Sequence, residues 1–268
     1  MSVAYAATYY TLREMMRRKL LLVFAGGGVL LACGLGLFIA LAPGQLLQGS
    51  SRAIFLVLFS GQIAEFFLFL TALGIGATTI YNDLDSGSVV SVFTKPISRL
   101  EYTLGKVAAA VAALAAVSLV LGIGLLIILE ISGGGHEDLL FLDFGRIVAN
   151  EATILVLVLM LTAVTNNVVA IVVAVVVTNL ANLINTFWIF TKDLSIATGW
   201  KVALTTLHWV LPRQLRYSVA SELVRVRASL GGVGSEALTS DWTDIVYWAV
   251  YLVLIVVVLY LLVRRKQV

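Results

Sequence analysis

Long apolar runs separated by short polar stretches make up most of this chain of 268 residues. A helix needs about 20 apolar residues to cross the roughly 30 Å hydrocarbon core of a bilayer. The pattern therefore predicts six membrane-spanning helices, at Leu20–Ala42, Ile54–Ile80, Val107–Ile131, Ile147–Val164, Val168–Phe190 and Thr243–Val263. The strands of a membrane barrel would alternate apolar and polar residues, and these runs do not. We expect an all-α, polytopic helical membrane protein that forms a single domain over residues 1–268.

The fourth and fifth spans form one almost unbroken apolar stretch, which we divide at Thr165-Asn166-Asn167. A single helix through both would be about 65 Å long, roughly twice the thickness of the bilayer. The first span is longer than the apolar core of a signal peptide, which has about 7–15 residues. We therefore expect it to be retained as a membrane helix.

Composition agrees with this architecture, because 60% of the residues are hydrophobic and only 12% are charged. Soluble domains are about a quarter charged and under half apolar. Basic residues concentrate on the cytoplasmic side of membrane proteins. Ten of them precede the first span, join the second to the third, or follow the sixth: Arg13, Arg17, Arg18, Lys19, Lys95, Arg99, Lys106, Arg264, Arg265 and Lys266. Both termini are therefore expected in the cytoplasm.

The segment 191–242 is extracytoplasmic in this topology, although it carries six basic residues. The charge rule weakens for long loops, which accounts for part of this exception. A seventh span around Leu194–Leu211 would bring its arginines inside but would move Arg264–Lys266 outside, so we retain six spans. Within the segment, residues 213–230 space their apolar side chains as a helix does, which predicts an amphipathic helix on the outer membrane surface.

The N-terminal stretch Ala4–Lys19 is also amphipathic, with Tyr5, Tyr9 and Leu12 near one face and basic residues at its end. It predicts a cytoplasmic interfacial helix over residues 1–19 that lies along the membrane before the first span. The alternative is a basic topology anchor with no further role.

Few polar residues fall inside the predicted spans. Glu65 lies near the middle of the second, where an ionisable side chain costs roughly 2.5–3.5 kcal/mol to insert. It either faces a substrate path or pairs with a polar group on a neighbouring span. Asn179, Asn182 and Asn185 recur every three residues on the fifth span, where they either line the same path or form interhelical hydrogen bonds.

Sequence motifs for catalysis are missing. His136 and His208 are far apart and have no neighbouring ligands, so no metal site is expected. The phosphate-binding pattern G-x-x-x-x-G-K-[ST] does not occur, and no nucleophile lies beside a base and an acid. We therefore expect no catalytic residue, no cofactor of its own and no nucleic-acid partner.

The polar segment 81–106 separates the second and third spans. Pro96 biases Lys95 away from helical geometry, so the chain is expected to turn there. Ser98 and Glu101 have the spacing of a capping box, which predicts a helix that starts at this point and continues into the third span. The segment is either a rigid helix–turn–helix projection or an ordinary loop whose Val and Phe dip into the lipid interface.

Three strings in this region resemble the signature of ABC-2-type transporter permeases: Asp85-Ser86-Gly87-Ser88-Val89, Lys95-Pro96-Ile97-Ser98-Arg99 and Leu104-Gly105-Lys106. The six spans, the basic N-terminus and the polar excursion between the last two spans are similar too. The most similar subgroup resembles the membrane subunit of the nitrous-oxide-reductase maturation transporter. Asn82-Asp83 and Asp85 stand where a Glu is common, which leaves open the acid that plays the family's role.

The resemblance implies a permease subunit that is itself no enzyme, in a prokaryotic plasma (inner) membrane. It implies that a separate ATPase subunit, which binds ATP and Mg, docks on a coupling helix in segment 81–106. The residues expected at this docking surface are Asp85, Gly87, Val89, Val92, Phe93, Pro96 and Arg99. A second permease copy and membrane lipid are the other implied partners, and export is the implied direction.

Two other functions fit the same spans. One is a membrane scaffold or assembly factor of the same fold, and the other is an ion-coupled secondary carrier that uses Glu65. The absence of a phosphate loop fits a permease subunit whose ATPase is a separate chain, and co-purification of such an ATPase would separate the three functions.

Overall fold

The computed structural model describes residues 8–9, 11–12, 19–41, 50–81, 83, 98–131, 137–191, 198–212, 214–215 and 242–265. These residues form seven helices and no strand, as the apolar pattern predicts: α2 (Lys19–Leu41), α3 (Ser50–Thr79), α6 (Arg99–Ile131), α7 (Glu137–Thr162), α8 (Asn167–Thr191), α9 (Thr198–Val210) and α11 (Trp242–Arg265).

Five of the helices contain a stretch long and apolar enough to cross a membrane, in α3, α6, α7, α8 and α11. In α2 the apolar stretch among the described residues is shorter, Gly26–Ile39, so the count of six spans stays a prediction. Helix α9 has 13 residues, which amounts to about 20 Å and is shorter than the hydrocarbon core. Its length gives no support to a seventh span.

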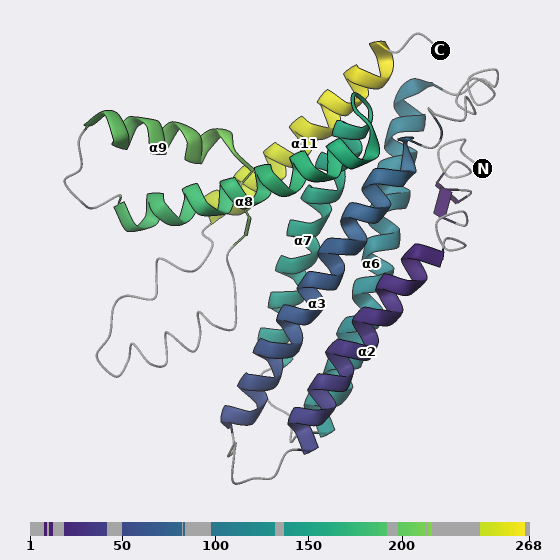
Figure 1. Ribbon diagram of the computed structural model, residues 1–268, viewed down its shortest axis with the longest axis vertical. Coiled ribbons are helices and arrows are strands. Elements are labelled where there is room, and N and C mark those ends of the chain that lie inside the picture. The colour runs from purple at the N-terminus through teal and green to yellow at the C-terminus, as the bar shows by residue number, and fades with distance from the viewer. Residues whose placement is uncertain are drawn as a thin grey trace.

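Helices α2, α3, α6 and α7 form an elongated bundle in which each packs against neighbours along much of its length (Figure 1). Helix α11 packs against α6 and α7. Helices α8 and α9 lie side by side and cross the bundle at a wide angle, with α8 contacting α3 and α7.

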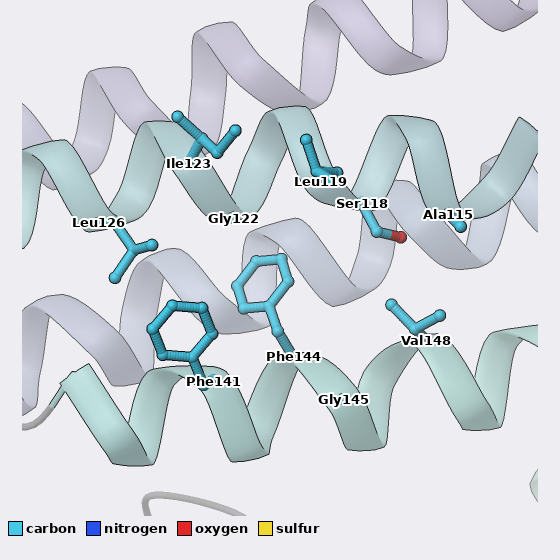
Figure 2. A pocket seen from close by; sticks show the side chains of 10 residues that line it. All are labelled: Ala115, Ser118, Leu119, Gly122, Ile123, Leu126, Phe141, Phe144, Gly145 and Val148. Carbon is cyan, nitrogen blue, oxygen red and sulfur yellow. The ribbon is translucent and has the colours of Figure 1, made fainter.

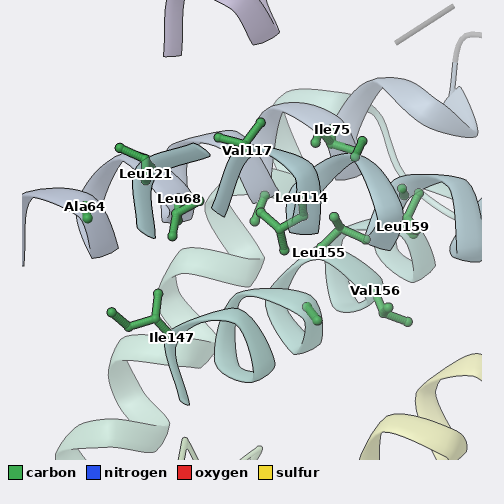
Figure 3. Packing of buried hydrophobic residues seen from close by; sticks show 14 of the residues in the cluster. Ala64, Leu68, Ile75, Leu114, Val117, Leu121, Ile147, Leu155, Val156 and Leu159 are labelled. Atoms are coloured by element: carbon green, nitrogen blue, oxygen red, sulfur yellow. The ribbon is translucent and has the colours of Figure 1, made fainter. Parts of the chain in front are cut away.

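The main hydrophobic core lies between α2, α3, α6, α7 and α11. Its fully buried side chains include Leu68, Leu114 and Leu155, and Figure 3 shows Leu114 and Leu155 next to each other between the helices. Helices α3 and α7 lie close together at Gly76, where a Cβ would lie 2.8 Å from Val158 Cβ and 2.9 Å from the Leu155 carbonyl oxygen. Only a glycine allows this approach, in line with the small-residue packing of membrane helices.

Two helix starts agree with the sequence prediction. The backbone amide of Ser98 donates to Glu101 Oε2 at 2.9 Å, and the amide of Glu101 donates to Ser98 Oγ at 3.2 Å, which completes the capping box. At the division between the fourth and fifth spans, the amide of Val169 donates to Asn166 Oδ1 at 2.8 Å and caps α8.

One helix boundary was predicted wrongly. Helix α7 begins at Glu137 rather than Ile147, so Asp143 and Arg146 belong to a helix and not to a loop. The charges of these two residues are balanced inside the bundle, and they therefore do not end the helix.

Two predicted amphipathic helices lie largely outside the described residues. Of Ala4–Lys19, the structure describes Thr8–Tyr9, Thr11–Leu12 and Lys19, the first residue of α2; all are helical, and Leu12 packs against the main core. Of residues 213–230, it describes Gln214 and Leu215, which are not helical.

Candidate functional site

The two ends of the polar segment 81–106 are joined by the side chain of Asp83. Its Oδ2 lies 2.7 Å from Lys106 Nζ and accepts a hydrogen bond of 2.7 Å from the hydroxyl of Tyr102. Tyr102 and Lys106 are one turn apart on α6, so both side chains leave the same face of that helix. The side chains of Lys106 and Asp83 are only 9% and 16% exposed, which makes this a largely buried charged contact.

The beginning of α6 is also tied to more distant parts of the chain. The guanidinium of Arg99 donates to the carbonyl oxygen of Arg264, near the end of α11. The hydroxyl of Thr8 donates to the carbonyl oxygen of Gly105 at 3.4 Å. The first turns of α6 therefore contact the N-terminal segment, Asp83 in the chain after α3, and the end of α11. We call this set of contacts the α6 base.

Of the predicted docking residues, only Arg99 belongs to the described part of the chain. Asp85, Gly87, Val89, Val92, Phe93 and Pro96 lie outside the described residues, and Arg99 is half-buried in the α6 base. Asp83 was left open as a possible family acid, and the structure places it against Lys106. The i, i+4 spacing of Tyr102 and Lys106 was the sequence signal for a shared face, but it did not identify the acid that they contact.

A second group of charges lies between α3 and α7. Arg146 makes a two-pronged contact with Glu65, from Nη1 to Oε1 at 3.2 Å and from Nη2 to Oε2 at 3.0 Å. Its Nε donates to Asp143 Oδ1 at 2.9 Å. Of the two alternatives for Glu65, the pairing with a neighbouring helix is therefore present, and a role in a substrate path stays a prediction.

Glu151 is a buried acid that the sequence analysis did not single out. It is 2% exposed, and its Oε2 has no hydrogen-bond partner among the described residues. It follows Asn150 on α7, and Asp143, Arg146 and Asn150 recur at intervals of three and four residues. This periodicity was the available signal that one face of α7 is polar, but it was obscured because the predicted span began at Ile147.

Polar side chains fix the start of the segment that follows α9. The carboxamide of Asn150 donates to the Leu215 carbonyl at 3.1 Å and accepts from the Leu215 amide at 2.8 Å. The carboxamide of Asn182 donates to Gln214 Oε1 at 2.9 Å. Residues 214–215 are thus held against α7 and α8 by two asparagines, one of which was a candidate path residue.

The other two asparagines of α8 occupy different environments. Asn179 is exposed and donates to the Val175 carbonyl of its own helix at 2.8 Å, whereas Asn185 is buried. Steps of three residues drift around a helix of 3.6 residues per turn, so the three side chains do not share one face. Whether any of them lines a substrate path stays a prediction.

Helix α11 completes this end of the bundle. The indole N–H of Trp248 contacts Thr153 Oγ1 at 2.7 Å and the Ala149 carbonyl at 3.2 Å. The hydroxyl of Tyr247 lies 2.8 Å from the Trp209 carbonyl and 2.9 Å from the Leu211 carbonyl. The end of α9 and the residues after it are therefore attached to α7, α8 and α11.

An apolar groove of about 370 Å³ lies between α6 and α7. Six residues of α6 between Ala115 and Leu126 and four of α7 between Phe141 and Val148 line it. Figure 2 shows Phe141, Phe144 and Leu126 toward one end, and Ala115, Ser118 and Val148 toward the other. Among the described residues, no three His, Cys, Asp or Glu come together in a way that could hold a metal ion.

Several apolar helices of bilayer length and a charged network between two of them define a multi-pass membrane protein. The model of the ABC-2 family transporter proteins matches residues 4–268, and the chain belongs to this family. None of the curated proteins compared with the chain matches it. The chain is thus a membrane permease subunit of an ABC transporter and not itself the ATPase, while the nitrous-oxide-reductase subgroup stays a prediction.

Proposed function

We propose that an ABC ATPase subunit docks on segment 81–106 and that its ATP-driven movement is transmitted through the α6 base to the membrane helices. The observation that carries this proposal is the contact of Asp83 with Tyr102 and Lys106. It joins Asp83, shortly after the end of α3 at Thr79, to the first turns of α6, so the segment between them is held at both ends. A force on the segment is therefore transmitted to α6 and to the chain that follows α3.

Helix α6 is suited to pass this movement on. It is one continuous helix from Arg99 to Ile131, and it packs against α2, α3, α7 and α11. Because the Asp83–Lys106 pair is largely buried, it is weakly screened and is broken less easily than a surface pair. The Arg99 contact with the end of α11 gives the movement a second point of attachment.

The geometry favours this function over an ion-coupled carrier. Such a carrier would need Glu65 to exchange its partner for an ion during each cycle. Arg146 already pairs with both oxygens of Glu65 and is itself held by Asp143. Displacing it would leave buried charges without partners, which costs several kcal/mol.

The test is co-purification in mild detergent. We expect an ATPase with a phosphate loop to accompany the wild-type chain, and Phe93→Ala with Pro96→Ala to reduce the bound ATPase at least tenfold. The matched control is Glu130→Gln, at the opposite end of α6, which should leave the complex intact. An unchanged complex in the double variant would refute docking at this segment, and a chain that never retains an ATPase would support the scaffold or carrier.

Several further features of the proposal are inferred from membership of the ABC-2 family. We infer a homodimer with two ATPase subunits that bind ATP and Mg, in a prokaryotic plasma membrane with both termini cytoplasmic. We infer export as the direction. Sealed vesicles with the ATPase sites outside should accumulate the substrate inside when ATP is added, and ATP-driven release from preloaded vesicles would show import instead.

A further inference from the structure

The groove between α6 and α7 takes no part in the coupling path described above. It lies along two helices with apolar stretches long enough to span the membrane, Arg99–Ile131 and Asp143–Thr162, and its lining on α7 begins just before the second stretch, at Phe141. Its walls include Leu119 and Phe141, which are 61% and 64% exposed, so no described helix covers them. At this depth a groove open to its surroundings contacts hydrocarbon rather than water.

The chemistry of the groove excludes a polar occupant. Ser118 is the one lining side chain with a hydroxyl, and it donates to the Leu114 carbonyl at 2.9 Å. The other lining residues are apolar or glycine, and their backbone amides belong to helices. A polar group placed here would lose its hydrogen bonds to water at a cost of roughly 2–7 kcal/mol. The occupant must therefore be hydrocarbon.

Small residues create the space. Gly145 has no atom of the described chain within 4 Å of the position that a Cβ would occupy, although Phe144 and Val148 flank it. Ala115 is exposed, and Gly122 would bring a Cβ no closer than 3.5 Å to the ring of Phe144. The open space beside Gly145 and the exposed Ala115 leaves room for larger side chains, which would fill the groove.

The close packing of α6 and α7 favours a lipid tail in the groove over a helix of a second copy. The lining on α6 extends over about 17 Å at 1.5 Å per residue. Helices α6 and α7 pack against each other, so a third helix, about 10 Å wide, would lie over the groove rather than inside it. A single hydrocarbon chain is much thinner and can lie inside the groove, along its lining.

We propose that this groove is a binding site for one acyl chain of a membrane phospholipid. The chain enters sideways from the bilayer and lies along Gly145 and Ser118, between the aromatic rings of α7 and the aliphatic side chains of α6. The proposal does not depend on ATPase docking, because it concerns only the two helices and the surrounding lipid.

The test uses the full-length permease, with its ATPase if one is bound, in nanodiscs of phosphatidylethanolamine and phosphatidylglycerol. The probe is a trace of phosphatidylethanolamine with a diazirine at the middle of one acyl chain, activated by light and mapped by mass spectrometry. We expect labelling of the wild-type chain to concentrate in residues 115–126 and 141–148. Gly145→Leu should lower the labelling there at least fivefold.

Two variants control the experiment. Gly34→Leu adds the same side chain at another exposed helical glycine with no described atom within 4 Å, and it should leave the labelling unchanged. Ala115→Leu fills the groove from α6, so it tests the same prediction if Gly145→Leu fails to fold.

Three results would overturn the proposal. The first is labelling spread evenly over all exposed apolar helix faces, which indicates only bulk lipid. The second is labelling at the groove that persists in both filled variants. The third is a cross-link between two copies through a cysteine placed at Gly145, which would make the groove a contact between subunits.

Discussion

Arg146 is the residue on which the charges between α3 and α7 depend. It is the only cation among the described residues that contacts Glu65 and Asp143, and its three donated hydrogen bonds bind both carboxylates. Planar guanidinium groups suit this arrangement, because their donors match the geometry of a carboxylate. A lysine would provide one point charge in place of the two-pronged contact with Glu65.

Replacing this residue, Arg146→Gln, should lower the free energy of unfolding by about 3 kcal/mol. The glutamine leaves two buried carboxylates without a cation, and breaking a buried pair from one side costs about this much. Thermal unfolding in detergent measures the loss.

The double variant Glu65→Gln with Arg146→Gln is the control. It should recover part of the stability, because fewer charges are then left unbalanced. If Arg146→Gln unfolds at the wild-type temperature, water rather than the guanidinium balances these carboxylates.

The sequence identified Glu65 because a single charge inside an apolar run is conspicuous. It did not identify the partner, since 81 residues separate Glu65 from Arg146 and no local periodicity connects two helices. Glu151 was missed for a related reason. An acid in an apolar run can be counted, but only the packing of α7 shows that it is 2% exposed.

Helix α6 shows what local chemistry can specify. Its start at Ser98 and Glu101 follows from a capping box, which depends on two residues three positions apart. The division between α7 and α8 follows likewise from Asn166, which caps the second helix. The early start of α7 was not predicted, because a charged pair that is balanced by Glu65 looks like a loop when that partner is unknown.

The capping box can be tested by Ser98→Ala, which should destabilise the first turn of α6 by about 1 kcal/mol. One kcal/mol corresponds to roughly a fivefold increase in the local opening constant. Amide hydrogen exchange of Glu101 and Tyr102, whose amides donate to Ser98, should therefore speed up about fivefold, while residues 110–120 keep the wild-type rate. Equal exchange in both proteins would show that the α6 base holds this turn without the cap.

At the scale of the whole molecule, the apolar pattern predicted helices and their order, but not how they cross. The angle between α8 and the bundle depends on contacts among side chains from α3, α7 and residue 214, which lie far apart in the sequence. The docking surface was predicted from resemblance alone, and all its residues except Arg99 lie outside the described part of the chain. What the structure adds is the connection of that segment to the helices.

This connection predicts the behaviour of Asp83→Ala. The variant should still bind the ATPase, because segment 84–97 is unchanged, but ATP should no longer alter α6. In the wild-type complex, we expect ATP to change the hydrogen exchange of residues 107–114, and in Asp83→Ala this change should fall at least threefold.

Glu130→Gln is the matched control, since it removes an acid from the opposite end of the same helix. If ATP changes α6 equally in wild type and Asp83→Ala, then the movement reaches the membrane without passing through the Asp83 contact.

The α6 base also makes residues 84–97 an insert that can be exchanged without changing the helices on either side. Asp83, Tyr102 and Lys106 fix where the chain leaves and re-enters the bundle, whatever sequence lies between them. With the ATPase docked on this segment as proposed, a permease built in this way would acquire a different ATPase by substituting one short insert, with no repacking of its core. The choice of ATPase and the arrangement of the membrane helices can therefore diversify independently.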